Sequence, residues 1–342
     1  PYAAMVKPGI YQIWRRDSLL KAHTLLAVVT FPPDVFYPVG VTTVGIFIRK
    51  GIPHPLGQPV LWVRAMNDGL WKSKGKRLPN PRMADDLGQV RPLMRAFLGN
   101  PWYPVSNIQQ FQKAAPIDST DKMLELAPEV YLDQAAPTEA EAIHDVDESV
   151  RSTFAYLVKI NRAVITQIPK PRTQAMYLPP DHWQNFTAET LFTLDRGDFH
   201  SISNLDPGPN ITISRVSMDN GMVGFYDKPD DARVLPAKVL TVSTVTGDAF
   251  VQPKAFIATD NVVLCTPKAP HAPMRLTSLY FIAAMLNRVR WRYSYGRQCY
   301  KSKFAQTDVV LPVKADGSLD ENYMAAIVGN AEFWPLVEAA HD

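Results

Sequence analysis

Residues 211–267 constrain the fold of this chain more than any other part of it. They read ITISRVSMDNGMVGFYDKP and, after nine further residues, VLTVSTVTGDAFVQPKAFIATDNVVLCTP. Short runs of β-forming residues alternate with Asn-Gly, Thr-Gly and Pro-containing turns, which are typical of tight hairpins. Polar side chains lie beside the turns and form no apolar helical stripe. The stretch therefore predicts a β-sheet built from short strands, with polar residues gathered near its turns.

Composition indicates a globular protein with a small net charge. With 342 residues, 46% apolar and 20% charged, the chain is long enough for one large or two ordinary domains, each with a core. The net charge of +3 is too small to indicate nucleic-acid binding, so a DNA site must come from local clustering. Cys265 and Cys299 offer neither a disulfide framework nor metal-ligand spacing, which favours a reducing, cytoplasmic setting.

The first part of the chain predicts an α/β arrangement. Residues 10–23 have apolar positions at helical spacing. The continuous apolar runs at 25–31 and 41–48 predict strands covered on both faces, as in a mainly parallel α/β sheet. Residues 24–48 are long enough to cross a bilayer, but an Asp and three prolines interrupt them, so we expect no membrane segment. The sequence begins with Pro rather than Met, which is typical of a fragment or a processed product.

The middle of the chain predicts a connector. Residues 118–148 are strongly acidic and are expected to form a solvated helix face or a mobile linker. A helix is predicted at 150–168, ended by Pro169. Further on, residues 276–287 are uncharged almost all round, which predicts a core helix beneath the sheet, with a protein interface as the alternative.

A basic and aromatic segment follows that helix and contains no acid. Its rings, Trp291, Tyr293 and Tyr295, alternate with the cations, so on a strand the charges and rings would face opposite sides. If half of the cations faced DNA, they would neutralise roughly three phosphates. The alternative is that the rings fill the core and the arginines are simply solvated. The cations are Arg288, Arg290, Arg292, Arg297, Lys301 and Lys303.

Residues 15–51 resemble the late part of the catalytic domain of adenine-N6 DNA methyltransferases, the modification subunits of type I and related restriction systems. In that family a helix with an Arg…Leu-Leu pattern leads to a strand, a Leu/Phe-Pro loop, an aromatic turn and a last apolar strand. The resemblance covers about the first 80 residues. The matching residues are Pro1-Tyr2, Arg16, Leu19, Leu20, Phe31-Pro32, Phe36-Tyr37 and the strand to Ile48.

The family's own catalytic motifs are not in their expected places. The resemblance implies S-adenosylmethionine bound at a Gly-rich turn and an Asn/Asp-Pro-Pro-Tyr/Phe loop that holds a flipped adenine. The sequence Asn100-Pro-Trp-Tyr103 has Trp in place of the second Pro, and Phe31-Pro-Pro-Asp34 lacks the leading amide. We interpret both as structural loops. The cofactor is therefore expected in the intact protein and not on this chain alone, and no catalytic residue is assigned.

Residues 211–267 and the segment after them resemble the target-recognition domain of DNA methyltransferases and restriction specificity subunits. The order and the turn chemistry agree over about 120 residues. One departure is Asp219 in place of the family's first Asn, since an exposed carboxylate would repel phosphate. The matching residues are Ile213-Ser214, Ser217, Asn220-Gly221, Gly224-Phe225-Tyr226, Leu240-Thr-Val-Ser243, Gly247, Phe250-Val-Gln252, Ala255-Phe256, Tyr295-Gly296-Arg297, Lys303-Phe304 and the strand 309–313.

The resemblance and the charge pattern together predict a set of DNA-contacting side chains. Arg215 and Gln252 suit bidentate contacts to guanine and adenine, each discriminating by roughly 1–3 kcal/mol. For any single polar residue near a turn, a structural role is the alternative. The predicted DNA-binding residues are Ser214, Arg215, Ser217, Asn220, Tyr226, Ser243, Gln252, Arg290, Arg292, Tyr295, Arg297, Lys301 and Lys303.

The predicted fold class is α/β, with the C-terminal part of a Rossmann-like methyltransferase sheet, a helical connector and an α+β DNA target-recognition domain. The corresponding boundaries are 1–80, 81–184 and 185–342. The function expected is sequence-specific recognition of double-stranded DNA within an adenine-N6 methyltransferase of a restriction–modification system. The alternatives are a stand-alone specificity subunit that docks a separate methyltransferase or nuclease subunit and, less favoured, a methyltransferase acting on RNA or protein.

Overall fold

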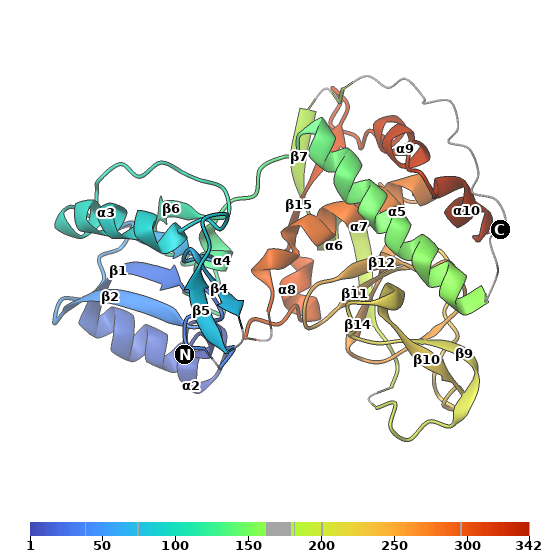
Figure 1. Cartoon of the computed structure of the whole chain (residues 1–342), viewed down its shortest axis with the longest axis horizontal. Helices are drawn as coiled ribbons and strands as arrows, with labels where there is room; N and C mark the ends of the chain where they lie inside the picture. The colour runs from blue at the N-terminus through green and yellow to red at the C-terminus, as the bar shows by residue number, and fades with distance from the viewer. Residues whose placement is uncertain are drawn as a thin grey trace. The chain divides into compact units, whose positions relative to one another are not determined.

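A computed structural model describes residues 1–37, 39–73, 75–161, 179–180, 182–199, 201–294 and 296–341. The chain divides into two compact units, Pro1–Ala135 (unit 1) and Ala136–Asp342 (unit 2) (Figure 1). This single division differs from the boundaries expected after residues 80 and 184. The difference arises because the acidic region expected to form a connector is shared between the two units.

Unit 1 is a mixed α/β unit. Its central sheet has the order β2-β1-β3-β6, and small strands β4 and β5 form a separate hairpin. Its elements are α1 (Ala3–Val6), α2 (Ile10–Ile13), the π-helical segment η1 (Trp14–Leu20), β1 (His23–Thr30), β2 (Val44–Lys50), β3 (Val60–Arg64), β4 (Leu70–Ser73), β5 (Lys76–Pro79), α3 (Asp86–Gly99), β6 (Gln112–Ala115) and α4 (Pro128–Tyr131).

The apolar runs predicted a mainly parallel sheet in unit 1, and this prediction is wrong. Strand β1 is parallel to β3 but antiparallel to β2, and β3 is antiparallel to β6. The central strand β1 is buried along its length, as expected of a covered strand. Strand β2 is an edge strand instead, and Ile46, Phe47 and Ile48 are exposed. The β-branched run therefore predicted the strand correctly but not the burial of its two faces, because burial depends on neighbours distant in sequence.

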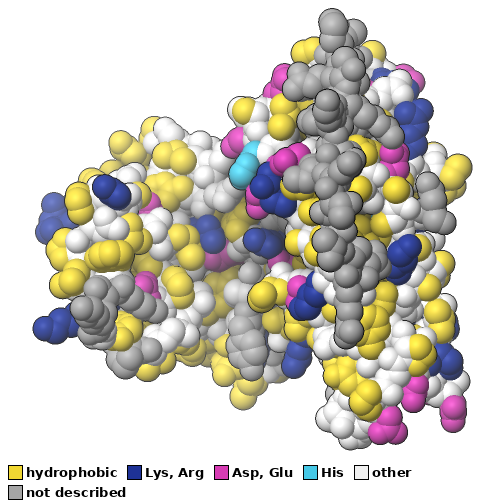
Figure 2. All heavy atoms as spheres, turned by 45° about the vertical axis from the view of Figure 1, so that its right-hand side comes forward, with side chains coloured by type: hydrophobic (Ala, Val, Ile, Leu, Met, Phe, Trp, Pro, Cys, Tyr) yellow, Lys and Arg dark blue, Asp and Glu magenta, His cyan; other side chains and the backbone are white. Residues whose placement is uncertain are grey.

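Other large apolar side chains of unit 1 also face outward. Ile10 and Ile13 on α2 are 78% and 53% exposed, and Leu56 in the loop after β2 is 96% exposed. Figure 2 shows hydrophobic side chains spread over the visible surface of unit 1. Of the exposed apolar side chains of unit 1, those of β2 lie on an edge strand, and an exposed edge is where further polypeptide can pair. Among the described residues, no helix is long and apolar enough to cross a membrane.

A buried arginine organises the N-terminal helices of unit 1. Arg15 is 0% exposed, and its guanidinium donates to four carbonyl oxygens, those of Ala4, Lys7, Met123 and Leu124. Two of these carbonyls belong to α1 or its end, and two belong to the loop before α4. One side chain thus satisfies backbone groups that no helix or strand pairs, and it fixes both segments against η1.

The acidic run is not a solvated surface throughout. In unit 1, Glu129 on α4 is only 5% exposed. It accepts hydrogen bonds from the hydroxyls of Tyr2 at 2.9 Å and Thr30 at 3.3 Å and lies 3.7 Å from Arg64. This carboxylate ties the first residues of the chain to β1 and β3, so part of the predicted mobile linker is a structural element of the core.

Unit 2 combines several small sheets with a buried helix. Its sheets have the orders β12-β11-β14-β8, β10-β9-β13 and β15-β7. Its elements are α5 (Glu139–Asn161), β7 (His182–Thr187), α6 (Ala188–Leu191), β8 (Phe192–Arg196), β9 (Pro207–Ile213), η2 (Asp219–Gly221), β10 (Met222–Tyr226), β11 (Leu240–Ser243), β12 (Ala249–Val251), β13 (Ile257–Ala258), β14 (Val262–Pro267), α7 (Leu276–Val289), η3 (Arg290–Arg292), α8 (Lys301–Ala305), β15 (Asp308–Val313), α9 (Glu321–Gly329) and α10 (Trp334–Ala339).

Helix α7 is the centre of unit 2, which confirms the prediction of a core helix. Residues 278–286 are all buried, and the helix contacts α5, α9, β12 and β15. At its end the Asn287 side chain both donates to and accepts from the backbone of Ala249, which fixes β12 against the helix. The strands that carry the turns of unit 2 are therefore attached to a rigid, buried element.

The acidic residues after position 138 form the start of α5, earlier than the helix predicted at 150–168. Thr138 and Glu141 form a capping box, in which each side chain accepts a hydrogen bond from the other's backbone N–H. Glu141 also pairs with Arg288 of α7 at 3.0 Å. The backbone N–H of Thr138 and the Arg288 guanidinium lower the pKa of Glu141 to about 2. Residues 162–168 of the predicted helix lie outside the described residues.

The Arg15→Met substitution is expected to destabilise unit 1 by roughly 3 kcal/mol, because it leaves four buried carbonyl groups without their donor. The matched control is Arg16→Met, since the neighbouring Arg16 side chain is 62% exposed and, among the described residues, pairs only with Asp17. Urea denaturation measures the change, and peptide-resolved hydrogen exchange assigns it to unit 1. Equal stability of the two variants would contradict this account of Arg15.

Candidate functional site

Three segments of unit 2 converge on the carboxylate of Asp248. This residue lies at the turn between β11 and β12 and is 3% exposed. Its Oδ2 atom accepts hydrogen bonds from Ser217 Oγ at 2.5 Å and from Thr246 Oγ1. Its Oδ1 atom accepts from Arg290 Nη1 at 2.5 Å. The carboxylate thus joins the loop 214–218 after β9, its own turn and the 3-10 turn η3; we call these three segments the Asp248 cluster.

The backbone of the loop 214–218 is attached to the same turn. Ser243 Oγ donates to the carbonyl of Arg215 at 3.3 Å, and the Ser243 N–H donates to the Asp248 carbonyl at 2.9 Å. Ser214 Oγ accepts from Thr259 Oγ1 at 3.1 Å. The loop is therefore held at both ends, even though it is not part of a helix or strand.

The outer face of this cluster combines cationic, hydroxyl and apolar side chains. Arg215 is exposed, and no hydrogen bond or ion pair involves its guanidinium among the described residues. Met218 next to it is 75% exposed, and the Arg290 side chain is 55% exposed even though it binds Asp248. An unpaired guanidinium and exposed hydroxyls at loop tips are the groups that contact phosphates and base edges.

Two amide residues predicted to contact DNA lie in the interior instead. Asn220 is 0% and Gln252 1% exposed. Gln252 Nε2 donates to the Asn220 carbonyl and to Thr241 Oγ1, and Asn220 Nδ2 donates to the carbonyl of Val251. Asn220 also accepts from Thr153 of α5 at 3.3 Å. In this structure the two amides hold the η2 turn against β11, β12 and α5, which is the structural role considered as the alternative.

The η2 turn itself confirms the interpretation of the Asp-Asn-Gly sequence as a tight turn. Asp219, Asn220 and Gly221 all have positive φ, at 51°, 56° and 81°. Asn and Gly tolerate this conformation better than other residues do. The Asp219 carboxylate pairs with Lys159 of α5 at 2.5 Å, so its charge is compensated within the protein.

The basic segment is not a strand, so the expected alternation of rings and cations across a sheet is wrong. Arg288 lies in the last turn of α7 and pairs with Glu141 and Asp145. Arg290 and Arg292 belong to η3, and Arg292 lies over the Trp291 ring at 4.6 Å. The segment contains no acid in sequence, but acids from α5 and from the Asp248 turn neutralise part of it.

The remaining predicted residues of unit 2 differ in exposure. Arg297 is 8% exposed and donates to the carbonyl of Arg292, so it is also an interior residue. Lys301 is exposed and donates to the carbonyl of Leu194 at 3.3 Å. Tyr226 and Lys303 are partly buried. Tyr295 lies outside the described residues.

Charge in unit 2 is balanced rather than basic. Residues 136–342 contain 20 Lys and Arg against 23 Asp and Glu. Some exposed cations are also neutralised, as Arg233 is by Asp195 and Asp198, and these carboxylates raise the pKa of its guanidinium. A long-range attraction of DNA to this unit is therefore not expected, and affinity has to come from short contacts.

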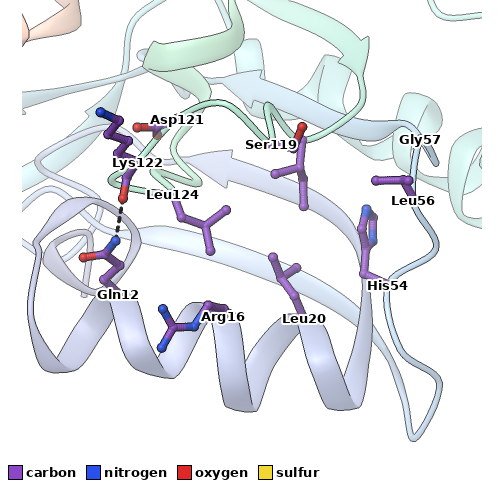
Figure 3. Close-up of a pocket in the computed structure, with 11 residues that line it drawn as sticks. Gln12, Arg16, Leu20, His54, Leu56, Gly57, Ser119, Asp121, Lys122 and Leu124 are labelled. Carbon is purple, nitrogen blue, oxygen red and sulfur yellow. Dashed lines mark hydrogen bonds between the residues drawn. The ribbon is translucent and has the colours of Figure 1, made fainter.

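Unit 1 contains a separate open pocket of about 410 Å³. Figure 3 shows Gln12, Arg16 and Leu20 of the α2–η1 helix on one side, with His54 and the loop around Asp121 on the others. The Asp121 carboxylate accepts from the backbone N–H groups of Met123 and Glu125. Burial lowers the pKa of His54. The bonds of Asp121 serve the loop's own geometry, and among the described residues no hydrogen bond joins Ser119 to His54, which both line the pocket.

The residues present do not fit S-adenosylmethionine. Strand β1 runs into Phe31-Pro32-Pro33 rather than into a Gly-rich turn that lets a ligand approach the backbone. The Phe31 ring also fills the space at this end of the sheet, since a Cβ on Gly45 would lie 3.0 Å from it. The NPWY sequence at 100–103 forms a surface turn, with Trp102 68% exposed. We derive no reaction step through this cofactor.

Fold and site define a two-unit mixed α/β protein whose second unit presents a cluster of loops with an exposed arginine. The chain is similar to the type II restriction enzyme and methyltransferase RM.BcgI of Heyndrickxia coagulans, with 35% identity over 69 residues, 20% of this chain and 11% of that protein. The chain thus spans about a tenth of the length of the curated relative that it matches. No protein-family profile matches the chain.

Solved structures of specificity subunits give weaker similarities. The HsdS subunit from Thermoanaerobacter tengcongensis superposes with a TM-score of 0.32 and 13% identity, over 59% of this chain and 46% of that one. The S subunit of a type I restriction–modification system from M. genitalium gives 0.34 and 9%, over 86% and 79%. At these TM-scores a shared fold is not established, so the functional argument depends on the residues.

The Gln252→Ala substitution is expected to destabilise unit 2 by roughly 2–3 kcal/mol, because a buried carbonyl and a buried hydroxyl lose their hydrogen-bond partner. Gln306→Ala is the control, since Gln306 is exposed and its side chain bonds only to exposed Glu189 within the described part of the chain. Thermal unfolding measures both variants. If Gln252→Ala unfolds like the wild type, Gln252 is not the structural residue described here.

Proposed function

We propose that this chain recognises a DNA sequence within a restriction–modification system, as part of an S-adenosylmethionine-dependent adenine-N6 methyltransferase. The observation that carries the proposal is the Asp248 cluster, which places the exposed Arg215 and Arg290 with Ser217 on loops fixed to a buried helix. The partial sequence similarity to RM.BcgI supports the same setting. The proposed target is double-stranded DNA.

Three exposed cations of unit 2 have proposed contacts. The guanidinium of Arg215, which has no partner among the described residues, has the donor fork that matches guanine O6 and N7 in the major groove. Arg290 uses one nitrogen for Asp248 and has further N–H donors for a phosphate. Lys301 adds a contact to the DNA backbone that positions the protein without reading sequence, whereas Ser217 gives its hydroxyl proton to Asp248 and orients the loop. Asn220, Gln252 and Arg297 support this surface from the interior.

Unit 1 is proposed to join the catalytic part of such an enzyme. Its edge strand β2 and helix α2 carry exposed apolar side chains, which suits burial against further polypeptide. The catalytic part belongs either to the same polypeptide or to a separate subunit. In both arrangements the bond chemistry and the cofactor reside outside the residues described here.

Duplex DNA is expected to bind this chain at low salt, with log K falling against log salt at a slope of about −2 to −3. Arg215→Ala is expected to weaken the preference for a selected sequence roughly 10-fold or more, because one bidentate base contact is lost. The control is Arg275→Ala, at the opposite end of α7 from Arg290, where the arginine pairs with Glu321. Fluorescence anisotropy with duplexes selected from a random library measures both.

Absence of duplex binding at low salt would refute the proposal for unit 2. Equal loss of preference in the Arg215 and Arg275 variants would instead show that the effect is one of general charge. A competition with double-stranded RNA separates DNA recognition from the less favoured RNA target.

This chain by itself is expected to transfer no methyl group from S-adenosylmethionine to duplex DNA, because the turn and the loop that serve this chemistry are not among its residues. Incorporation of labelled methyl groups into bound duplex measures the activity. Binding without incorporation is the expected result. Clear incorporation by the chain alone contradicts the proposal that the methyl-transfer chemistry resides outside this chain.

A further inference from the structure

We propose that Asp248 is a positioning residue that couples the loop carrying Arg215 to the phosphate-contacting Arg290, so that sequence preference depends on this one carboxylate. The inference deepens the proposed function and rests on it. It follows from the way that Asp248 distributes its two oxygens between different segments of the chain.

The two oxygens of the Asp248 carboxylate bind different segments. Oδ2 holds Ser217 of the loop 214–218 together with Thr246 of the turn, and Oδ1 holds Arg290 of η3. Asp248 is 3% exposed, so it exchanges these partners for water only if a segment moves. The orientation of each segment therefore constrains the other two.

Backbone hydrogen bonds connect Asp248 to Arg215. The side chain of Arg215 has no partner among the described residues, but its carbonyl accepts from Ser243 Oγ, and the Ser243 N–H donates to the Asp248 carbonyl. Ser217 lies two residues further along the same loop and bonds directly to the carboxylate. The loop is thus fixed on both sides of Val216, which sets the direction in which Arg215 leaves the protein.

The negative charge of Asp248 has two opposing effects on DNA binding. Asp248 orients Arg290, but its negative charge also opposes the approach of phosphate. Asp248→Asn keeps the shape, removes that charge and weakens the bonds to Ser217, Thr246 and Arg290. The variant is therefore expected to bind unselected DNA as tightly as the wild type or more tightly, while its sequence preference falls. A residue with only a structural role would lower both affinities together.

The experiment measures three quantities for wild type and Asp248→Asn: the sequence profile selected from a randomised duplex library, the affinity for an unselected duplex, and the melting temperature. The ratio of selected to unselected affinity is expected to fall about 10-fold or more. In the Arg215→Ala background the same change is expected to lower the ratio no further, because both variants lose one contact. Additive losses in this double-mutant cycle overturn the coupling.

Asp219→Asn is the matched control, since it removes one carboxylate from the neighbouring turn, where the partner is Lys159 and not the Asp248 cluster. Its sequence profile is expected to equal that of the wild type. If the Asp248 variant fails to fold, Ser217→Ala decides the matter, because it deletes one bond of the cluster at an exposed position. A flattened profile supports the inference and an unchanged one overturns it.

The outcomes also separate the inference from the proposed function. A wild type that binds no duplex and enriches no sequence refutes the proposed function. A wild type that selects a sequence, together with an Asp248→Asn variant that selects the same one equally well, leaves the function standing and refutes the role of Asp248.

Discussion

A buried charge has to satisfy its hydrogen-bonding capacity within the protein, and in this chain that requirement holds the irregular segments in place. Arg15 does so in unit 1 by donating to carbonyls of two separate segments. Asp248 does so in unit 2 by accepting from three. In both cases the bonds join segments that are distant in sequence, including the loop before α4 in unit 1 and the loop 214–218 in unit 2. The surface near these charges is consequently defined by a few strong bonds, which makes it sensitive to single substitutions.

Sequence patterns predicted the elements whose signal is local. The uncharged stretch that became α7 and the apolar run that became β1 are covered on all sides, so their own composition sufficed. The Asn220-Gly221 turn followed from its backbone requirement alone. Strand β2 has an equally apolar sequence, yet it lies at an edge. Whether a strand is covered depends on pairing with distant segments, and that information is absent from a local pattern.

The candidate site was predictable only in part for the same reason. Arg215 and Gln252 both have side chains suited to base contacts, and both lie near turns. The backbone places Arg215 on a loop tip, whereas Gln252 lies inside and bonds to Asn220 and Thr241. Helical spacing predicts Arg15 on the polar side of its helix together with Arg16, and this is wrong for Arg15, which is buried because it bonds to carbonyls of distant segments. Asp248 has no sequence signal at all beyond a position next to a glycine, and only the convergence of three segments reveals it.

The charge runs illustrate how composition and surface can differ. The acid-rich start of α5 and the acid-free segment after α7 look like opposite surfaces in sequence, but Glu141 and Asp145 neutralise Arg288 between them. Asp248 likewise binds Arg290. What remains for a polyanion is a small number of cations whose direction is fixed rather than a broad basic face. Such a surface attracts a polyanion only weakly at long range. It therefore favours recognition through short contacts whose direction is fixed.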